Sequence, residues 1–435
     1  METGQGKERK KRCVCKCVLL FLTILLLSAC VQGCDRTDEK AKVEVSGEIP
    51  KSEQEILLAE AETAAKDYQK IYKEKPEISL KEMVEKMGKR GYIIIDENNQ
   101  TNLQNPKKLR KFCEEIASGR EGTVRFYRAL ERNGIRQTDL TFDGTNLIIT
   151  NVALSREKED QFISYMERYA AKEWKVTEKG YLIYKKYRPA GYDGEDAVDA
   201  VRMEPIPDEL RELCKRYVPQ SGYYNGGLFF EEWNEKNYDR LDFRSLFEEF
   251  YRIQNGNYPA DDVYPEGIPA QEFESVVQSY LSVPVEILRG RQEYQKEKNC
   301  YKREEMLYRR YNITNVPVPE VTAYKENPDG TLTITVEAVW KERMTDCAFV
   351  HEVTVRQRGE RSFQYIGNRI IQSEENMLPT YMEEAEKKVE GSIQCQRREH
   401  KIRYKKTTRD TELQKEREKA SIGCGSGFLC FWLLE

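Results

Sequence analysis

Residues 121–152 read EGTVRFYRALERNGIRQTDLTFDGTNLIITNV, and this stretch decides the fold class. Apolar side chains recur with a period near two through Leu140–Phe142 and Leu147–Val152, as they do in β-strands. Between these two segments, Asp143-Gly144 is typical of a tight hairpin turn. Consecutive strands joined by short turns predict an antiparallel meander.

The strand pattern continues on both sides of this hairpin. Further strands are predicted at Tyr92–Ile95, Val124–Tyr127, Phe162–Tyr169, Glu173–Val176 and Tyr181–Tyr187. Lys179-Gly180 is a second turn signal, so the last two of these strands form another hairpin.

Helices are predicted before the meander, each with a start or stop signal. Ser52-x-x-Glu55 and Ser79-x-x-Glu82 are both capping boxes, in which Ser and Glu satisfy backbone N–H groups at a helix start. Pro76 ends the first helix. Asn105-Pro106 starts the third helix with the proline at its first position, and Gly119 ends it.

The second half of the chain has a different composition. Residues 189–316 are rich in Tyr, Pro and Gly, with helices predicted at Phe243–Tyr251 and Phe273–Leu281. Strands return in residues 317–372, where Asn327-Pro-Asp-Gly330 is a strong turn signal. The predicted fold class is α+β: N-terminal helices packed on an antiparallel β-meander, a mixed Tyr-rich helical and loop insertion, and a second small antiparallel β-sheet.

The first thirty residues indicate an exported, lipid-anchored protein. Six basic residues precede Val18–Ala29, an apolar run that matches a signal-peptide core and is too short to span a membrane. The run ends in Leu27-Ser28-Ala29-Cys30, which resembles the lipobox of bacterial lipoproteins. Two acyl chains on the Cys30 thiol give a stable anchor, because each buried CH₂ contributes about 0.8 kcal/mol. The alternative is an ordinary secretory signal in which Cys30 is incidental.

These boundaries predict the organisation of the chain. Its expected parts are a signal peptide (1–29), a tether (30–51), an α+β domain (52–188), a helical and loop Tyr-rich segment (189–316), a β-hairpin sheet (317–372) and a charged tail (373–435). The tail is nearly all charged or polar up to residue 419, which predicts disorder. A basic, membrane-touching tail and a shifted reading frame are the alternatives.

The charge balance excludes nucleic acid as an expected partner. The chain carries 71 basic and 75 acidic residues, a net charge of −4. Residues 1–29 hold six basic and two acidic residues, so the chain without them is more acidic and repels phosphates. With two His and no C-x₂-C pair, neither a metal nor another cofactor is expected.

Several segments of the body together resemble a family of exported lipoproteins of clostridia-type bacteria that is described only as a domain of unknown function. The resemblance spans about residues 52–371 and rests on Gly91–Asp96, Phe142–Leu147, Trp174 with Glu178–Tyr181, Trp233-Asn234, Pro319–Tyr324 and His351–Val355 with Gly367–Ile371. It implies a lipoprotein without an assigned activity, and it implies no catalytic residue.

Candidate site residues come from the Tyr-rich segment. The candidate catalytic acids are Glu231, Glu232, Asp261 and Asp262, because glycoside hydrolysis needs a pair of carboxyl groups. The candidate ligand-binding residues are Tyr223, Tyr224, Trp233, Tyr258 and Tyr264, whose ring faces suit sugars. In a chain with 75 acids, however, chance neighbours are expected. His351 alternates with Phe349 and Val353, which predicts a histidine in the core.

The sequence therefore predicts a lipoprotein held by its anchor on the outer face of the bacterial cytoplasmic membrane. We expect a non-enzymatic, envelope-facing binding or interaction module, with cell-wall glycan or another envelope protein as its partner. The alternative is a carboxylate-based hydrolase that acts on cell-wall or external glycan.

Overall fold

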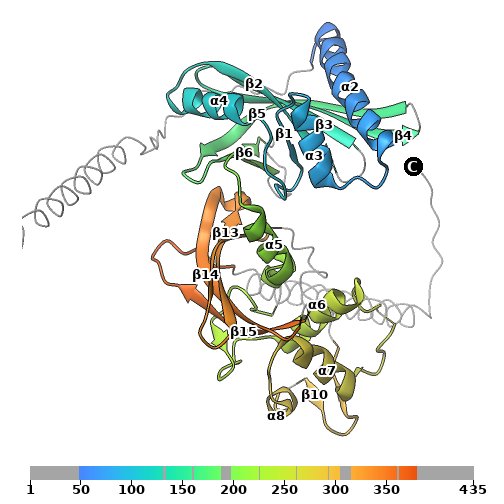
Figure 1. Ribbon diagram of the computed structural model, residues 1–435, viewed down its shortest axis with the longest axis vertical. Coiled ribbons are helices and arrows are strands. Elements are labelled where there is room, and N and C mark those ends of the chain that lie inside the picture. Colours follow the sequence, from blue (N-terminus) through green and yellow to red (C-terminus); the bar gives the residue numbers. More distant parts are fainter. Residues whose placement is uncertain are drawn as a thin grey trace, which may run out of the picture. The chain divides into compact units, whose positions relative to one another are not determined.

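The computed structural model describes residues 49–130, 134–158, 161–187, 197–224, 226–260, 262–291, 293–303, 315–359 and 362–379 (Figure 1). This part of the chain has the α+β fold expected from the sequence, with helices packed on antiparallel-dominated sheets. The expected signal peptide, Cys30, most of the tether and residues 380–435 lie outside it. No helix within these ranges is long and apolar enough to cross a membrane.

The first sheet follows the order of the chain. Within the described ranges its strands are β1 (Ile94–Asp96), β2 (Gly122–Leu130), β3 (Gly134–Phe142), β4 (Leu147–Lys158), β5 (Gln161–Val176), β6 (Tyr181–Lys186) and β7 (Val198–Arg202). Neighbours from β2 to β7 are antiparallel, which confirms the predicted meander, whereas β1 runs parallel to β2.

Two strands of this sheet differ from the sequence prediction. The segments Phe162–Tyr169 and Glu173–Val176 are parts of one long strand, β5, with a register shift between Ala171 and Glu173. Strand β7 lies in the range that was predicted to contain only helices and loops. Its five residues are too few to show a clear period.

Helices cover both faces of the first sheet. They are α2 (Lys51–Glu74), α3 (Leu80–Lys89) and α4 (Lys107–Ala117). Phe126 and Tyr127 are consecutive in β2, so their side chains point to opposite faces. Phe126 packs in the cluster that contains the apolar side of α4, and Tyr127 packs in the cluster that contains α2 and α3. The helices therefore do not form the single layer suggested by their order.

The caps of these helices confirm one capping box and correct another. The Ser79 oxygen accepts the Glu82 N–H, and the Glu82 carboxylate accepts the Ser79 N–H, as predicted. Helix α2 instead follows Pro50 and has no side-chain cap, so the Ser52 capping box is wrong. Ser52 lies within the first turn of α2, two residues past the position from which a side chain caps. Pro106 likewise precedes α4, whose first residue is Lys107.

The second sheet is antiparallel and has the order β12-β13-β14-β15-β8. Its described strands are β12 (Val318–Glu326), β13 (Thr331–Trp340), β14 (Thr345–Gln357), β15 (Phe363–Ile371) and β8 (Trp233–Asn234). Residues 327–330 form the predicted turn between β12 and β13. The short β8 comes from much earlier in the chain and pairs with β15 through Gly367 and Asn368.

The segment between the two sheets is mainly helical and packs against the second sheet. Its helices are α5 (Asp208–Tyr217), α6 (Phe243–Asn255), α7 (Ala270–Tyr280) and α8 (Val285–Arg289), of which α6 and α7 were predicted. A small sheet joins β10 (Tyr294–Gln295), β11 (Cys300–Tyr301) and β9 (Ile268–Pro269). Phe273 stacks between Phe247 at 5.1 Å and Tyr301 at 4.0 Å, so many aromatic rings of this segment fill its core.

We predict that Ser79→Ala lowers the free energy of unfolding by about 1 kcal/mol, because the N–H of Glu82 loses its side-chain acceptor. Ser52→Ala is the matched control and should change it far less, since Ser52 caps nothing. Urea unfolding of the two variants measures both values. Equal losses would contradict the assignment of the caps.

Candidate functional site

The candidate site is a cleft on the outer face of the second sheet. The register of the strands aligns Thr333, Thr354, Gly367 and Asn234 in one row across β13, β14, β15 and β8. These residues are half-buried or exposed. The row therefore forms a polar floor that is open to a ligand.

The adjacent row points to the other face, because side chains alternate along each strand. It contains Ile334, Val353, Asn368 and Trp233, and all of them are buried. The alternation fixes which residues of the sheet can meet a ligand. A one-residue shift of β8 would bury Asn234 and expose Trp233.

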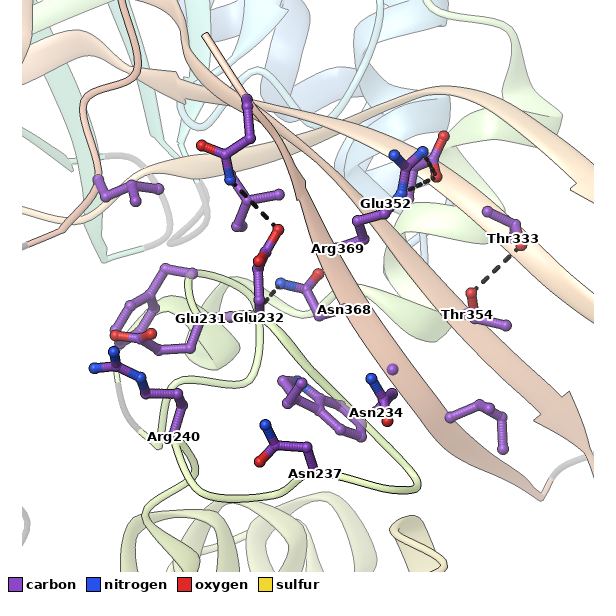
Figure 2. Close-up of a pocket in the computed structure, with 17 residues that line it drawn as sticks. Glu231, Glu232, Asn234, Asn237, Arg240, Thr333, Glu352, Thr354, Asn368 and Arg369 are labelled. Carbon is purple, nitrogen blue, oxygen red and sulfur yellow. Dashed lines mark hydrogen bonds and ion pairs between the residues drawn. The ribbon is translucent and has the colours of Figure 1, made fainter. Parts of the chain in front are cut away.

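Loops around β8 and the end of β15 form the walls of the cleft (Figure 2). Glu231 and Glu232 precede β8, Asn237 and Arg240 follow it, and Leu378 also lines the cleft. The cavity has a volume of about 790 Å³. This volume is within the range of small-molecule sites, and the cleft opens to solvent.

The charges in the cleft are partly balanced. Arg369 forms an ion pair of 2.6 Å with Glu352 beside the polar row. The Gln372 side chain donates a hydrogen bond of 3.4 Å to the Glu232 carboxylate. Arg240 is exposed on the loop after β8. The lining is therefore rich in hydrogen-bonding groups and has little net charge.

A buried chain of hydrogen bonds holds the wall that carries Glu231. The Asn368 amide donates to the Glu231 carbonyl at 2.8 Å, and its oxygen lies 2.7 Å from His351 Nδ1. The Tyr223 hydroxyl lies 2.6 Å from His351 Nε2. Burial lowers the pKa of His351 to about 4, although the hydrogen bond to Asn368 opposes this shift. His351 is thus a neutral core residue with both ring nitrogens bonded, in line with the sequence interpretation.

Gly367 is required for the docking of β8. A Cβ atom at this position would lie 2.9 Å from the Trp233 carbonyl oxygen, which is closer than such atoms approach. The absence of a side chain lets β8 pair with β15 and brings Asn234 into the polar row. The glycine at position 367 thus allows the polar row to extend from β15 onto β8.

The structure separates the residues that the sequence suggested for the site. Glu231, Glu232 and Trp233 line the cleft, but the Trp233 ring is 3% exposed and donates its N–H to the Leu228 carbonyl at 2.9 Å. Asp262 is in the loop after α6 and does not line the cleft, and Asp261 lies outside the described residues.

The candidate tyrosines serve mainly as packing residues. Tyr223 and Tyr264 are buried, and Tyr224 and Tyr258 are half-buried. Tyr258 donates to Glu249 at 3.3 Å, and Tyr264 donates to Glu272. None of these four rings lines the cleft, so they do not supply a stacking surface there.

The polar row itself was not predicted from the sequence. Its signal was the alternation of Thr331, Thr333 and Thr335 along β13, which marks a polar strand face. The pairing of Thr354 with Gly367, and of Gly367 with Asn234, depends on register between distant segments. A single sequence does not reveal that register.

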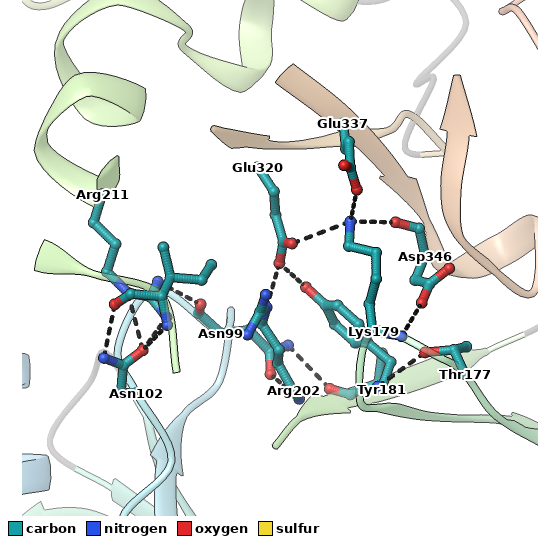
Figure 3. A network of polar contacts seen from close by, with 12 residues as sticks. Asn99, Asn102, Thr177, Lys179, Tyr181, Arg202, Arg211, Glu320, Glu337 and Asp346 are labelled. Atoms are coloured by element: carbon teal, nitrogen blue, oxygen red, sulfur yellow. Dashed lines mark hydrogen bonds and ion pairs between the residues drawn. The ribbon is translucent and has the colours of Figure 1, made fainter. Parts of the chain in front are cut away.

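A second polar cluster joins the turn between β5 and β6, and strands β6 and β7, to β12 and β13 of the second sheet (Figure 3). Lys179 forms ion pairs with Glu337 at 2.6 Å and Glu320 at 3.4 Å. Glu320 also accepts hydrogen bonds from Arg202 at 2.7 Å and from the Tyr181 hydroxyl. Burial and Glu320 raise the pKa of Tyr181 well above its usual value, so the phenol remains a donor. These groups bond one another, which is typical of a structural contact.

The fold and the cleft describe an α+β protein with an open polar cleft on one sheet. Residues 54–384 match the model of a family described as "Family of unknown function (DUF6070)", and the chain belongs to this family. Comparison with curated proteins and with solved structures finds no match.

We predict that His351 makes the protein less stable at acid pH. Its pKa of about 4 in the folded state is below the usual value of 6.5, so between these values the unfolded chain binds a proton that the folded chain does not. The free energy of unfolding therefore falls as the pH is lowered from 6.5 to 4, by up to about 3 kcal/mol from this group.

The His351→Gln variant tests this prediction against the wild type by urea unfolding from pH 7 to pH 4.5. Carboxylates and His400 titrate alike in both proteins, so the stability difference between them isolates His351. The advantage of the wild type should shrink as the pH falls. A constant difference would contradict the assignment.

Proposed function

We propose that this protein is a lipid-anchored, envelope-facing binding module that holds a polar cell-wall ligand in the cleft beside β8. The anchor would be Cys30, on the outer face of the cytoplasmic membrane. The observation that carries the binding role is the open cleft of about 790 Å³ with its row of polar side chains.

The chemistry of the lining favours binding over catalysis. Within the cleft, Glu352 is paired with Arg369 and Glu232 accepts from Gln372, so these carboxylates are engaged by neighbouring side chains. Hydroxyl and carboxamide groups dominate the floor, and such groups recognise a ligand by hydrogen bonds. The acidic body of the chain disfavours phosphate-rich partners.

The lipid anchor is tested by Cys30→Ala. This substitution removes the thiol that would be acylated, and we expect the protein to leave the membrane fraction or to retain its leader. Cys34→Ala is the matched control, because Val31-Gln32-Gly33 before it is a poorer lipobox. Cell fractionation and intact mass provide the readout. Unchanged membrane retention and mass in Cys30→Ala would overturn the anchor.

The binding role is tested by co-sedimentation of the full chain, in mild detergent, with purified cell-wall sacculi. We expect saturable pelleting that weakens about tenfold in Arg240→Ala, because a charged donor at the cleft is lost. Arg120→Ala removes another exposed arginine, after α4 and outside the cleft lining, and should pellet like the wild type. No saturable pelleting, or an equal effect of both variants, would overturn this role for the cleft.

A further inference from the structure

We propose that the cleft takes a neutral, β-linked glycan chain that lies across the strands of the second sheet, with successive sugars over successive strands. This inference rests on the proposed function, since it names the part of the wall that the cleft would recognise. It depends on three features of the cleft: the spacing of the row, the chemistry of its side chains and its charge.

The spacing of the row matches an extended polysaccharide. Neighbouring strands lie about 4.8 Å apart, so the row from β13 to β8 offers one residue at each such step. This step is close to the advance of one pyranose ring in an extended β-linked chain. A glycan that crosses the strands can therefore place successive sugars over successive strands, with Thr333, Thr354 and Asn234 as polar side chains beneath it and no side chain at Gly367.

The side chains of the row suit sugar hydroxyls. Thr333 and Thr354 have their hydroxyl oxygens 3.4 Å apart, and each hydroxyl can both donate and accept. Asn234 places a carboxamide at the other end of the row, where it is exposed. Such groups also match the N-acetyl substituents of amino sugars, which carry one amide donor and one acceptor.

The charge of the floor selects a neutral chain. The only charged side chains next to the row on β14 and β15 that line the cleft, Glu352 and Arg369, neutralise each other at 2.6 Å. The wall carries two acidic side chains, Glu231 and Glu232, and one basic side chain, Arg240, so its net negative charge disfavours anionic polymers. A neutral glycan loses no charge solvation when it enters the cleft, so it fits this surface better than a charged polymer does.

The experiment is calorimetric titration of the full chain, in detergent micelles, with β-1,4-linked N-acetylglucosamine oligosaccharides of two to six sugars. We expect the affinity to rise from the dimer to the tetramer and then to level off, because the row spans four strands. Affinity that does not depend on length would overturn the proposed orientation of the chain.

A pair of threonine variants tests the position of the ligand. Thr354→Val removes a hydroxyl of the row while it keeps the shape and the β-branching, and we expect five- to tenfold weaker binding of the tetramer, roughly the effect of one hydrogen bond. Thr335→Val is the matched control, since Thr335 is half-buried in β13 and does not line the cleft. Urea unfolding confirms that both variants are folded. Equal affinities of the two variants would overturn the site.

The outcomes separate this inference from the proposed function. Sacculi that pellet the wild type but not Arg240→Ala, together with no binding of any oligosaccharide, would overturn the glycan and leave the binding role intact. If the wild type binds neither sacculi nor any oligosaccharide, the proposed function is overturned as well.

Discussion

The first sheet depends on the carboxylate of Asp96, which organises the turn after β1. This buried group accepts hydrogen bonds from the backbone N–H groups of Asn98, Gln100 and Thr101 at 2.6–3.0 Å, and from the Thr101 hydroxyl at 2.7 Å. The turn holds Asn99 at a φ of +56°, in the left-handed region that asparagine tolerates. The Asn99 amide then donates to the Ala200 carbonyl and accepts the Arg202 N–H, both at 3.0 Å (Figure 3). Ala200 and Arg202 belong to β7. The Asn99 side chain, which lies just after the first strand of the sheet, therefore hydrogen-bonds the backbone of the last strand.

A buried ion pair links the same two ends of the sheet. Arg128 of β2 is fully buried and reaches Asp199 of β7 at 2.7 Å, and Arg136 reaches the same carboxylate at 2.9 Å. Burial alone would raise the pKa of Asp199, but the two guanidinium groups outweigh it and hold this pKa below its usual value. Loss of Asp199 would leave the fully buried Arg128 guanidinium without its carboxylate, at a cost of about 3–5 kcal/mol. The contact of β2 and β3 with β7 therefore depends on charged groups whose substitution is expected to be strongly destabilising.

The sequence predicted the parts of this fold that depend on local signals. The period of β3 and β4, the turn at residues 327–330 and the Ser79 cap arise from neighbouring residues, and all are present in the structure. Features that depend on pairing between distant segments were not predictable. Strands β7 and β8 are too short to show a period, and their places are determined by partners elsewhere in the chain.

The candidate site also contains residues that the sequence predicted and residues that it did not. Glu231, Glu232 and Trp233 were found by composition and do line the cleft, whereas the aromatic neighbours that suggested stacking proved to be core residues. Amphipathic rings are ambiguous in a sequence, because burial and ligand contact favour the same residues. The polar row became visible only when the register of four strands was known.

The pairing of β8 with β15 also determines when the cleft can form. Asn234 and Gly367 are separated by most of the second half of the chain, so closing this loop costs more entropy than forming the β12–β13 hairpin. During synthesis, which begins at the N-terminus, all strands of the first sheet, from β1 to β7, are made before β15. The cleft can therefore be completed only after β15 has been synthesised, whereas all strands of the first sheet are available before that point.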